Sequence, residues 1–205
     1  PERIWYGGIS PWRSENAASA LEASAVYWNQ AGAPLPGGGM ISAWAIDPHN
    51  SDRVWVGLSD GVIATTDNAT TADAQTVWVE CTPPFSGPAC ISWIEVDGNA
   101  PDGNTVYATN SAYGAQHVVI TRNGGLNWTN ITGNLPDIPV HCLVVQPGAP
   151  HHLLIGTGQG VYRSKDTGGT WTNINAQGMP NVAVESLEFQ DTRVLYAFTH
   201  GRGAF

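Results

Sequence analysis

The side chains best suited to chemistry in this sequence of 205 residues gather in a short turn motif that recurs along the chain. Its fullest copy occupies residues 164–171 (SKDTGGTW). A lone carboxylate such as Asp166 could ligate a metal ion or act as a general acid. In a turn, however, Asp commonly accepts hydrogen bonds from backbone amides, Gly supplies backbone angles that other residues resist, and Trp buries a large area. We therefore expect the motif to be structural.

Three weaker copies precede the full motif, each ahead of a tryptophan. Residues 121–128 (TRNGGLNW) are a conservative variant. Residues 65–69 (TTDNA), followed by Trp78, have additional residues in the turn, and residues 12–16 (WRSEN), followed by Trp28, are the most divergent. The residues expected to hold these structural turns are Asp67, Asn123, Gly125, Trp128, Ser164, Asp166, Gly168, Thr170 and Trp171.

Catalytic and metal-binding arrangements are not evident in the sequence. Glycoside hydrolysis needs two carboxyl groups that face each other across a cleft, and Asp166 is already assigned to a turn. The adjacent His151 and His152 could suggest a metal pair. Neighbouring residues of an extended chain point to opposite sides, so these two would be poor co-ligands. The sequence therefore assigns no catalytic residue, metal ligand or cofactor.

The turn motifs belong to an internal repeat. A pattern of apolar strand, polar turn and second strand has anchors at positions 47, 97, 146 and 190, which are 50, 49 and 44 residues apart. The tryptophans at 28, 78, 128 and 171 keep step, with intervals of 50, 50 and 43 residues. Two markers with one period match a propeller blade of four strands. The predicted fold class is therefore all-β: a partial or small β-propeller of four-stranded blades.

The repeat predicts one propeller domain or propeller fragment over residues 1–205. A partial blade at 1–39 is followed by blades at 40–88, 89–139 and 140–181 and by a partial blade at 182–205. The innermost strands are expected at 41–46, 91–96, 141–145 and 185–189. The Ala-rich residues 15–27 should form the tip of an inserted hairpin, with room for one helical turn. Further blades or a second copy would complete the ring, which usually has 4 to 8 blades.

Charge and composition narrow the choice of partner. The formal net charge is −9, only 12% of the residues are charged, and Lys165 is the only lysine. A nucleic acid needs a basic face to replace its counterions, so it is not an expected partner. No stretch approaches the roughly 20 apolar residues that span a bilayer, so membrane insertion is not expected either. Scarce lysine with abundant Thr, Asn, Gly and Trp suggests a secreted or cell-surface protein.

Three cysteines leave at least one thiol unpaired within the chain. Cys81 and Cys90 flank a stretch rich in turn-forming residues, and the sequence is compatible with a disulfide between them or with two buried thiols. Cys142 lies in an apolar strand and should be a small core residue.

The turn motifs are Asp-boxes, of the pattern Ser-x-Asp-x-Gly-x-Thr-Trp. Together with the turn that begins Asp47-Pro48 and the closing residues 199–203 (THGRG), they resemble the sortilin-like BNR/Asp-box propeller superfamily. That superfamily includes xyloglucanase-type glycoside hydrolases, photosystem II assembly factors and bacterial surface proteins. The resemblance covers nearly the whole chain and implies a propeller of Asp-box blades. It does not determine an activity, because one fold hosts many functions.

In a propeller, the loops from strand two to strand three and from strand four to the next blade share one face. Exposed aromatic, amide and charged side chains there would suit a glycan or a protein ligand, and the alternative is that they are ordinary loop residues. The predicted ligand-binding residues on this face are Asp60, Tyr113, Gln116, His117, Gln159, His200 and Arg202.

These observations favour a non-catalytic binding or scaffold module of a secreted or surface protein. One alternative is the C-terminal part of a xyloglucanase-like glycoside hydrolase whose catalytic acids lie on other blades. In those hydrolases an acid occurs in an Arg-Thr-Asp-x-Gly-Gly-like motif, to which residues 164–169 are only loosely similar. Another alternative is a purely structural part of a multidomain surface protein.

Overall fold

The computed structural model describes residues 3–20, 22–81, 83, 85–175 and 179–205. These residues form five antiparallel sheets, which we number in chain order. The first sheet contains β1 (Ile4–Gly7), β2 (Pro11–Ser14) and β3 (Asn29–Gln30). The fifth sheet contains β16 (Val184–Phe189), β17 (Leu195–Thr199) and β18 (Gly203–Ala204).

The three sheets between them have four strands each. The second sheet contains β4 (Ile41–Ile46), β5 (Val54–Leu58), β6 (Ile63–Thr66) and β7 (Val79–Cys81). The third sheet contains β8 (Ile91–Val96), β9 (Val106–Asn110), β10 (Val118–Thr121) and β11 (Trp128–Asn130). The fourth sheet contains β12 (Val140–Val145), β13 (Leu153–Thr157), β14 (Gly160–Ser164) and β15 (Thr172–Asn173).

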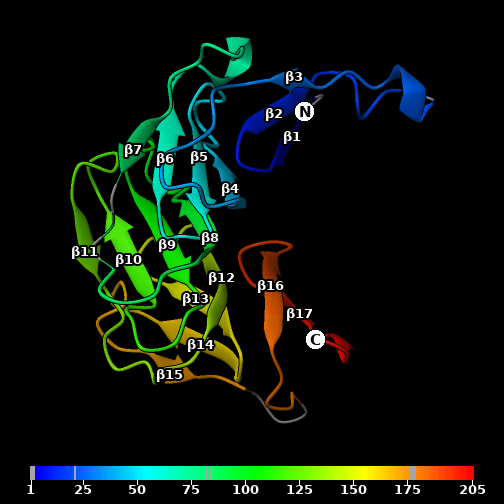
Figure 1. The fold of residues 1–205 in the computed structure, drawn as a ribbon. Coiled ribbons are helices and arrows are strands. Elements are labelled where there is room, and N and C mark those ends of the chain that lie inside the picture. Colours follow the sequence, from blue (N-terminus) through cyan, green and yellow to red (C-terminus); the bar gives the residue numbers. More distant parts are fainter. Residues whose placement is uncertain (1–2, 21, 82, 84, 176–178) are drawn as a thin grey trace.

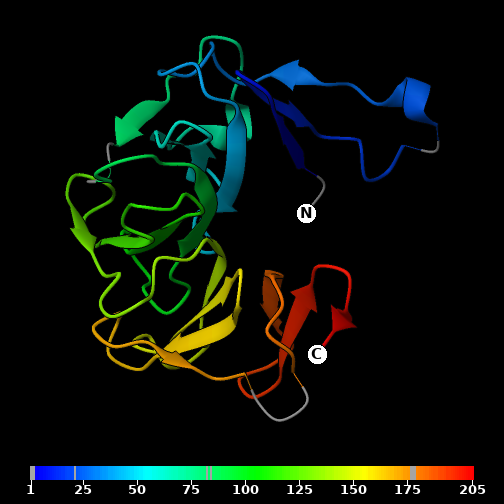
Figure 2. The ribbon, with the colours of Figure 1, turned by 60° about the horizontal axis from the view of Figure 1, so that its bottom comes forward.

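The sheets are arranged radially. Within each sheet, strands that are consecutive in sequence are hydrogen-bonded neighbours. The sheets follow one another along an arc, with their first strands toward its centre (Figure 1), and β4, β8, β12 and β16 contact one another in turn. The first and fifth sheets border the open side of the arc (Figure 2). This arrangement confirms the predicted β-propeller fold.

The inner strands lie where the alternation of apolar residues predicts them. β4 and β8 have the predicted bounds, and β12 and β16 each begin one residue earlier. All four have a shift of register near their first residue. At these shifts, Ser42 donates a hydrogen bond of 2.6 Å to the carbonyl of Ile91, and Ser92 donates one of 2.6 Å to the carbonyl of Val140. Each serine thereby links its inner strand to the next.

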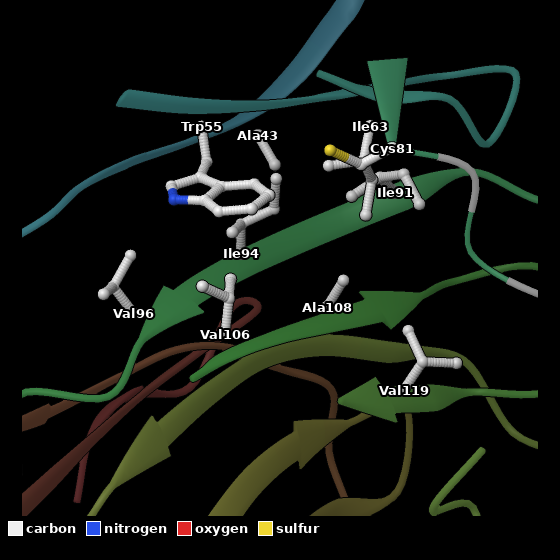
Figure 3. Close-up of a cluster of buried hydrophobic side chains, with 10 residues drawn as sticks. All are labelled: Ala43, Trp55, Ile63, Cys81, Ile91, Ile94, Val96, Val106, Ala108 and Val119. Atoms are coloured by element: carbon white, nitrogen blue, oxygen red, sulfur yellow. The ribbon is translucent and has the colours of Figure 1, made fainter. Parts of the chain in front are cut away.

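The core lies between neighbouring sheets, because alternate residues of a strand face opposite sides. In β5, Val54 and Val56 pack toward the first sheet, whereas Trp55 packs against the third (Figure 3). In β9, Val106 packs toward the second sheet and Tyr107 toward the fourth. All five side chains are almost completely buried. β5 and β9 therefore each present one face to the preceding sheet and the other face to the following one.

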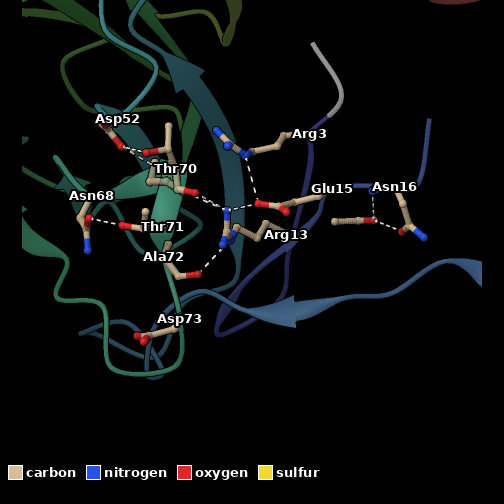
Figure 4. A network of polar contacts seen from close by, with 12 residues as sticks. Arg3, Arg13, Glu15, Asn16, Asp52, Asn68, Thr70, Thr71, Ala72 and Asp73 are labelled. Carbon is tan, nitrogen blue, oxygen red and sulfur yellow. Dashed lines mark hydrogen bonds and ion pairs between the residues drawn. The ribbon is translucent and has the colours of Figure 1, made fainter. Parts of the chain in front are cut away.

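Arg13 of β2 fastens the first sheet to the second (Figure 4). Its guanidinium donates hydrogen bonds to the carbonyls of Thr70 at 2.8 Å and Ala72 at 2.9 Å, and it pairs with Glu15 at 2.9 Å. Both carbonyls belong to the segment that contains the 3-10 turn η2 (Ala69–Thr71). The additional residues of this turn therefore form the acceptor site for Arg13.

The hairpin that joins β2 to β3 extends away from the arc (Figure 1). It contains a second 3-10 turn, η1 (Ala23–Ala25), which confirms the predicted hairpin tip, although residue 21 lies outside the described residues. Asn16 stabilises the hairpin by accepting the N–H of Tyr27 at 3.1 Å and donating to the carbonyl of Ala25 at 2.7 Å. No helix in the described part of the chain is long and apolar enough to cross a bilayer.

Cys81, Cys90 and Cys142 are all free thiols. Of the two alternatives that the sequence leaves open, the disulfide between Cys81 and Cys90 is therefore not formed. Cys81 ends the outermost strand of the second sheet, and Cys90 directly precedes the innermost strand of the third, so the two cysteines lie at opposite edges of neighbouring sheets. Cys142 is buried in the core between the fourth and fifth sheets, and its burial raises the pKa of the thiol to about 12.

Candidate functional site

The residues predicted to bind a ligand lie in turns at one end of the sheets. Each of these turns joins a second strand to a third strand: β5 to β6, β9 to β10, β13 to β14, or β17 to β18. Because all the sheets run in the same order from centre to edge, these turns share one end of the propeller. In chain order, the residues are Asp60, Tyr113, Gln116, His117, Gln159, His200 and Arg202.

Three of these residues hold the loops in place. Asp60 accepts the N–H of Gly39 at 2.9 Å. Gln116 accepts the N–H of Ser86 at 2.6 Å and donates to its hydroxyl at 2.7 Å. His117 is only 2% exposed, and its Nε2 lies 3.0 Å from a carboxylate oxygen in the loop before β12. Their polar atoms are therefore occupied by the protein itself.

The other four residues are exposed, but the structure does not bring them together. The Tyr113 side chain is 64% exposed, and His200 Nδ1 lies 3.6 Å from Glu185. Gln159 and Arg202 are also exposed. No hydrogen bond or ion pair connects one of these four residues to another in the described part of the chain. Their role as ligand contacts stays a prediction.

The side chain of Asp166 is occupied by its own turn. The hydroxyl of Ser164 donates to Asp166 at 2.7 Å and accepts the N–H of Gly168 at 2.8 Å, while Asp166 accepts the N–H of Thr170 at 2.8 Å. The hydrogen bonds from Ser164 and Thr170 hold the pKa of the Asp166 carboxyl below its ordinary value. A carboxylate used in this way is a turn-former rather than an acid.

The full motif also packs against the preceding sheet. Trp171 is buried and donates its Nε1–H to the carbonyl of Ile131 at 3.0 Å. Gly168 has a φ of +85°, and a Cβ there would lie 2.7 Å from Ile131. The motif at 121–128 repeats this geometry. Asn123 accepts the N–H of Asn127 at 2.9 Å, and a Cβ on Gly125 would lie 2.6 Å from the sulfur of Cys81 in the preceding sheet.

The second sheet corrects one of the predicted turn residues. The sequence suggested Asp67, but the ladder between β5 and β6 aligns Thr66 with Ser164 of the full motif. Asn68 then holds the place of Asp166, and its N–H donates to the hydroxyl of Thr66 at 3.3 Å. Asp67 instead pairs with Arg53 at 2.6 Å. The additional residues of this turn concealed the register in the sequence.

His151 and His152 do not act together. Nδ1 of His151 lies 3.0 Å from the hydroxyl of Thr167, and Nδ1 of His152 lies 3.2 Å from the side-chain oxygen of Gln146. Within the described ranges, no three His, Cys, Asp or Glu side chains gather as a metal site would require.

A cavity of about 430 Å³ lies at the opposite end of the sheets from the predicted face. It is formed by the last residues of β4, β8 and β12 and by the turns that follow them. Most of the residues that line it are of apolar type, and they include two tryptophans. The lining residues are Trp44, Ala45, Ile46, Pro48, Trp93, Ile94, Glu95, Val96, Gly98, Asn99, Val145 and Pro147.

Glu95 is the one acidic side chain among the described residues that line this cavity. The pKa of this carboxyl is raised from 4.5 to about 7, chiefly because burial removes the group from water and to a lesser extent because of the nearby Asp97. The opposing contributions are a hydrogen bond of 3.3 Å from Trp93 Nε1 and one from the backbone of Val145. Near neutral pH, this group can therefore accept or donate a proton or a hydrogen bond.

The neighbouring polar side chains are already engaged. Asp97 accepts hydrogen bonds from the backbone and side-chain N–H groups of Asn99, at 2.9 and 3.0 Å. Asn99 also donates to the carbonyl of Gln146 at 3.3 Å and accepts the N–H of Gly148 at 2.7 Å. Both residues therefore fix the turns around the cavity. Glu95 also accepts hydrogen bonds, from Trp93 and Val145, but it is the lining group whose pKa is strongly raised.

The sequence analysis missed Glu95. Its signal was an acid within a strand of otherwise mainly apolar residues (ISWIEV), at a position where β4 has Ala45 and β12 has Val144. A carboxyl group that lines a cavity and has a strongly raised pKa marks a candidate functional site.

No protein-family model matches the sequence, and no curated protein resembles it closely enough to count as a relative. Solved structures do resemble it. An ancestral GH74 enzyme matches with a TM-score of 0.70 and 20% identity, over 96% of this chain and 25% of that one. The GH74 xyloglucanase from Xanthomonas campestris matches with a TM-score of 0.67 and 14% identity, over 98% and 34%.

The WD40 β-propeller domain of Doa1 also matches, with a TM-score of 0.68 and 10% identity, over 97% of this chain and 58% of that one. The chain thus spans a quarter to a third of the length of the two GH74 proteins. At these identities the likeness shows the fold alone: the chain has the β-propeller fold that the GH74 enzymes and the WD40 domain share.

Proposed function

We propose that this chain is a non-catalytic carbohydrate-binding module and that a glycan occupies the cavity around Glu95. The observation that carries the proposal is the pairing of indole walls with a single protonatable carboxyl. The apolar face of a sugar ring can pack on Trp44 and Trp93, while Glu95 hydrogen-bonds a hydroxyl group. The formal net charge of −9 does not favour an anionic ligand.

The number of carboxyl groups favours binding over hydrolysis. Both the retaining and the inverting mechanisms commonly use two carboxyl groups on either side of the glycosidic bond. Glu95 has no acidic partner among the described lining residues, and Asp97 is occupied by Asn99. The alternative, a part of a glycoside hydrolase with its acids on other blades, differs from the proposal in requiring catalysis by the complete enzyme.

The named substrate of one structural neighbour suggests a first ligand to try. The Xanthomonas campestris protein is a xyloglucanase, so xyloglucan oligosaccharides are the glycans of first choice.

We also infer that the turns at 121–128 and 164–171 are Asp-boxes of the BNR superfamily, which their shared hydrogen bonds support. Such a module would be secreted or displayed on a cell surface.

Isothermal titration calorimetry of the chain with xyloglucan oligosaccharides tests the proposal. We expect saturable binding that Glu95→Gln weakens about tenfold, since removing one charged hydrogen-bond partner costs about 1.5–3 kcal/mol. Tyr113→Ala, on the opposite end, is the matched control and should bind as the unmodified chain does.

Three outcomes would count against this assignment. Loss of binding in Tyr113→Ala or Arg202→Ala, with none in Glu95→Gln, would place the ligand on the predicted loop face. Release of reducing ends by the chain would make it an enzyme. No binding of any oligosaccharide, combined with capture of a defined protein ligand, would make it a protein-binding propeller.

A further inference from the structure

One face of the first sheet is exposed, whereas the equivalent face of the second sheet is buried. Residues 1–7 repeat residues 51–57, so Ile4 and Tyr6 of β1 correspond to Val54 and Val56 of β5. Ile4 and Tyr6 are 41% and 64% exposed, whereas both valines are 0% exposed. The valines are covered because they pack toward the preceding sheet. Ile4 and Tyr6 face the place where a preceding sheet would lie.

The fifth sheet shows the complementary situation. The ladders align Leu187–Ala197 with Leu143–Ile155, so Tyr196 of β17 corresponds to Leu154 of β13. Leu154 is 5% exposed because it packs against the fifth sheet, whereas Tyr196 is 40% exposed. Phe198, on the same face as Tyr196, is 41% exposed. These two aromatic side chains face the place of a following sheet.

The opposite faces of the same two strands are covered in the normal way. Trp5 of β1 lies against Trp44, with 5.4 Å between ring centroids. Ala197 of β17 is buried against the fourth sheet. The exposure is thus confined to the outward faces of the terminal sheets, as the alternation along each strand requires.

The outward face of the first sheet is also hollowed and aromatic. Tyr6, Trp12 and Trp28 line a cavity of about 330 Å³, and the Tyr6 and Trp28 rings meet edge to face at 6.0 Å. Trp12 pairs with Tyr6 in the ladder, where the second sheet has the fully buried Ala64 beside Val56. A contiguous apolar surface of this kind is typical of an interface.

The inner edge of the first sheet is open as well. β5, the strand that corresponds to β1, pairs with β4 on one side and β6 on the other. Among the described residues β1 pairs only with β2. Its inner backbone groups are available to another strand, which is the usual consequence of an unprotected edge.

We propose that both outward faces are blade-docking surfaces, each of which packs against a further four-stranded sheet of the same repeat. The sheets are supplied by polypeptide outside residues 1–205. A second copy of the chain fits less well, because two copies bring ten sheets and propellers typically close with 4 to 8. This chain also covers 58% of the Doa1 propeller domain, so the remainder of a ring of that size is smaller than another copy.

Thiol labelling tests the proposal. In a Cys90→Ser background, where the remaining thiols are buried, Tyr6→Cys and Phe198→Cys are compared in the 205-residue chain and in the natural polypeptide that contains it. We expect both sites to react rapidly in the short chain and at least about tenfold more slowly in the natural polypeptide, because a covered thiol must wait for local opening. The control is Leu126→Cys, at a residue that is 82% exposed in a turn away from both faces.

The outcomes separate the possible occupants. Slower labelling at residues 6 and 198, with no change at residue 126, supports the proposal. Equal labelling in both polypeptides overturns it. Protection that appears in the short chain alone and rises with its concentration, together with a dimer mass from light scattering, would assign the faces to a second copy instead. The glycan-binding test concerns the cavity at the last residues of β4, β8 and β12, which is separate from both docking faces. Either proposal can therefore fail without the other.

Discussion

Glu95 should make the stability of the chain depend on pH. Its folded-state pKa of about 7 lies above the ordinary value of 4.5. The folded state therefore holds this proton more tightly than the unfolded state, and the stability it contributes is present below pH 4.5 and is lost as the pH rises through 7. Glu95→Gln should raise the free energy of unfolding by about 1–3 kcal/mol at pH 8 and change it little at pH 4.5.

Urea unfolding followed by tryptophan fluorescence at the two pH values measures this difference. Glu188→Gln is the matched control, since Glu188 has the same place in β16 but is exposed. An equal effect of Glu95→Gln at both pH values would show that the carboxyl is ionised throughout the range.

Gly168 offers a second prediction at the scale of a single residue. Its φ of +85° strains any other residue, and a Cβ there would also meet Ile131 at 2.7 Å. Gly148 has a similar φ of +75° but open space around it. Gly148→Ala should cost about 1–2 kcal/mol for the left-handed backbone alone, and Gly168→Ala should cost about 1–3 kcal/mol more for the clash.

Chemical denaturation of the two glycine variants side by side isolates the clash from the backbone strain. Equal destabilisation would mean that the turn can move away from the preceding sheet.

Single residues were the least predictable part of the molecule from sequence. The turn role of Asp166 follows from its motif, since Ser, Asp and Gly at fixed spacing can satisfy one another locally. That Asn68, and not Asp67, takes the place of Asp166 could not be predicted, because only the strand ladder sets the register of an enlarged turn. The raised pKa of Glu95 depends on what three neighbouring sheets place around it, which no local pattern contains.

At the scale of strands, the links between inner strands can be tested through Ser92. Its hydroxyl donates to the carbonyl of Val140 in the next sheet at 2.6 Å. Ser92→Ala leaves that carbonyl without this donor and should lower the free energy of unfolding by about 1–2 kcal/mol. Ser24→Ala, in the exposed hairpin, removes a hydroxyl that bonds only to Glu22 and should have almost no effect. Equal stability of the two variants would show that the serine contact does not fasten the sheets.

Strands were predicted more accurately than residues. Their alternation of apolar side chains is a local signal, and the repeat allowed four copies to be aligned, so β4 and β8 were placed with their observed bounds. The bulge at the start of each inner strand was not visible, because an extra residue in one strand of a pair is defined only by its partner.

At the scale of the whole molecule, the first sheet should be separable from the rest. Arg13 supplies several of the polar contacts that join it to the second sheet. Arg13→Met leaves buried carbonyls without a donor, so β1 and β2 should exchange their amide hydrogens about tenfold faster or more. The fourth sheet, which Arg13 does not touch, should exchange as before. Uniform acceleration in all five sheets would indicate that the chain unfolds as one cooperative unit.

The number of repeats and their radial packing were predictable because two residue markers share one period. The closure of the ring was not, since it depends on what lies beside the terminal sheets. The same separation holds for function: the fold could be foreseen, but the cavity arises only where three inner strands meet.

The serine contacts between inner strands have a consequence for how such chains change over evolutionary time. Ser42 and Ser92 occupy the same position in successive repeats, and each bonds to the first residue of the next inner strand. A gene duplication that adds or removes one whole repeat preserves such contacts, whereas the loss of part of an inner strand breaks one. Lineages should therefore gain and lose blades in complete units, so that the size of the ring can vary while the junctions of the remaining blades are kept.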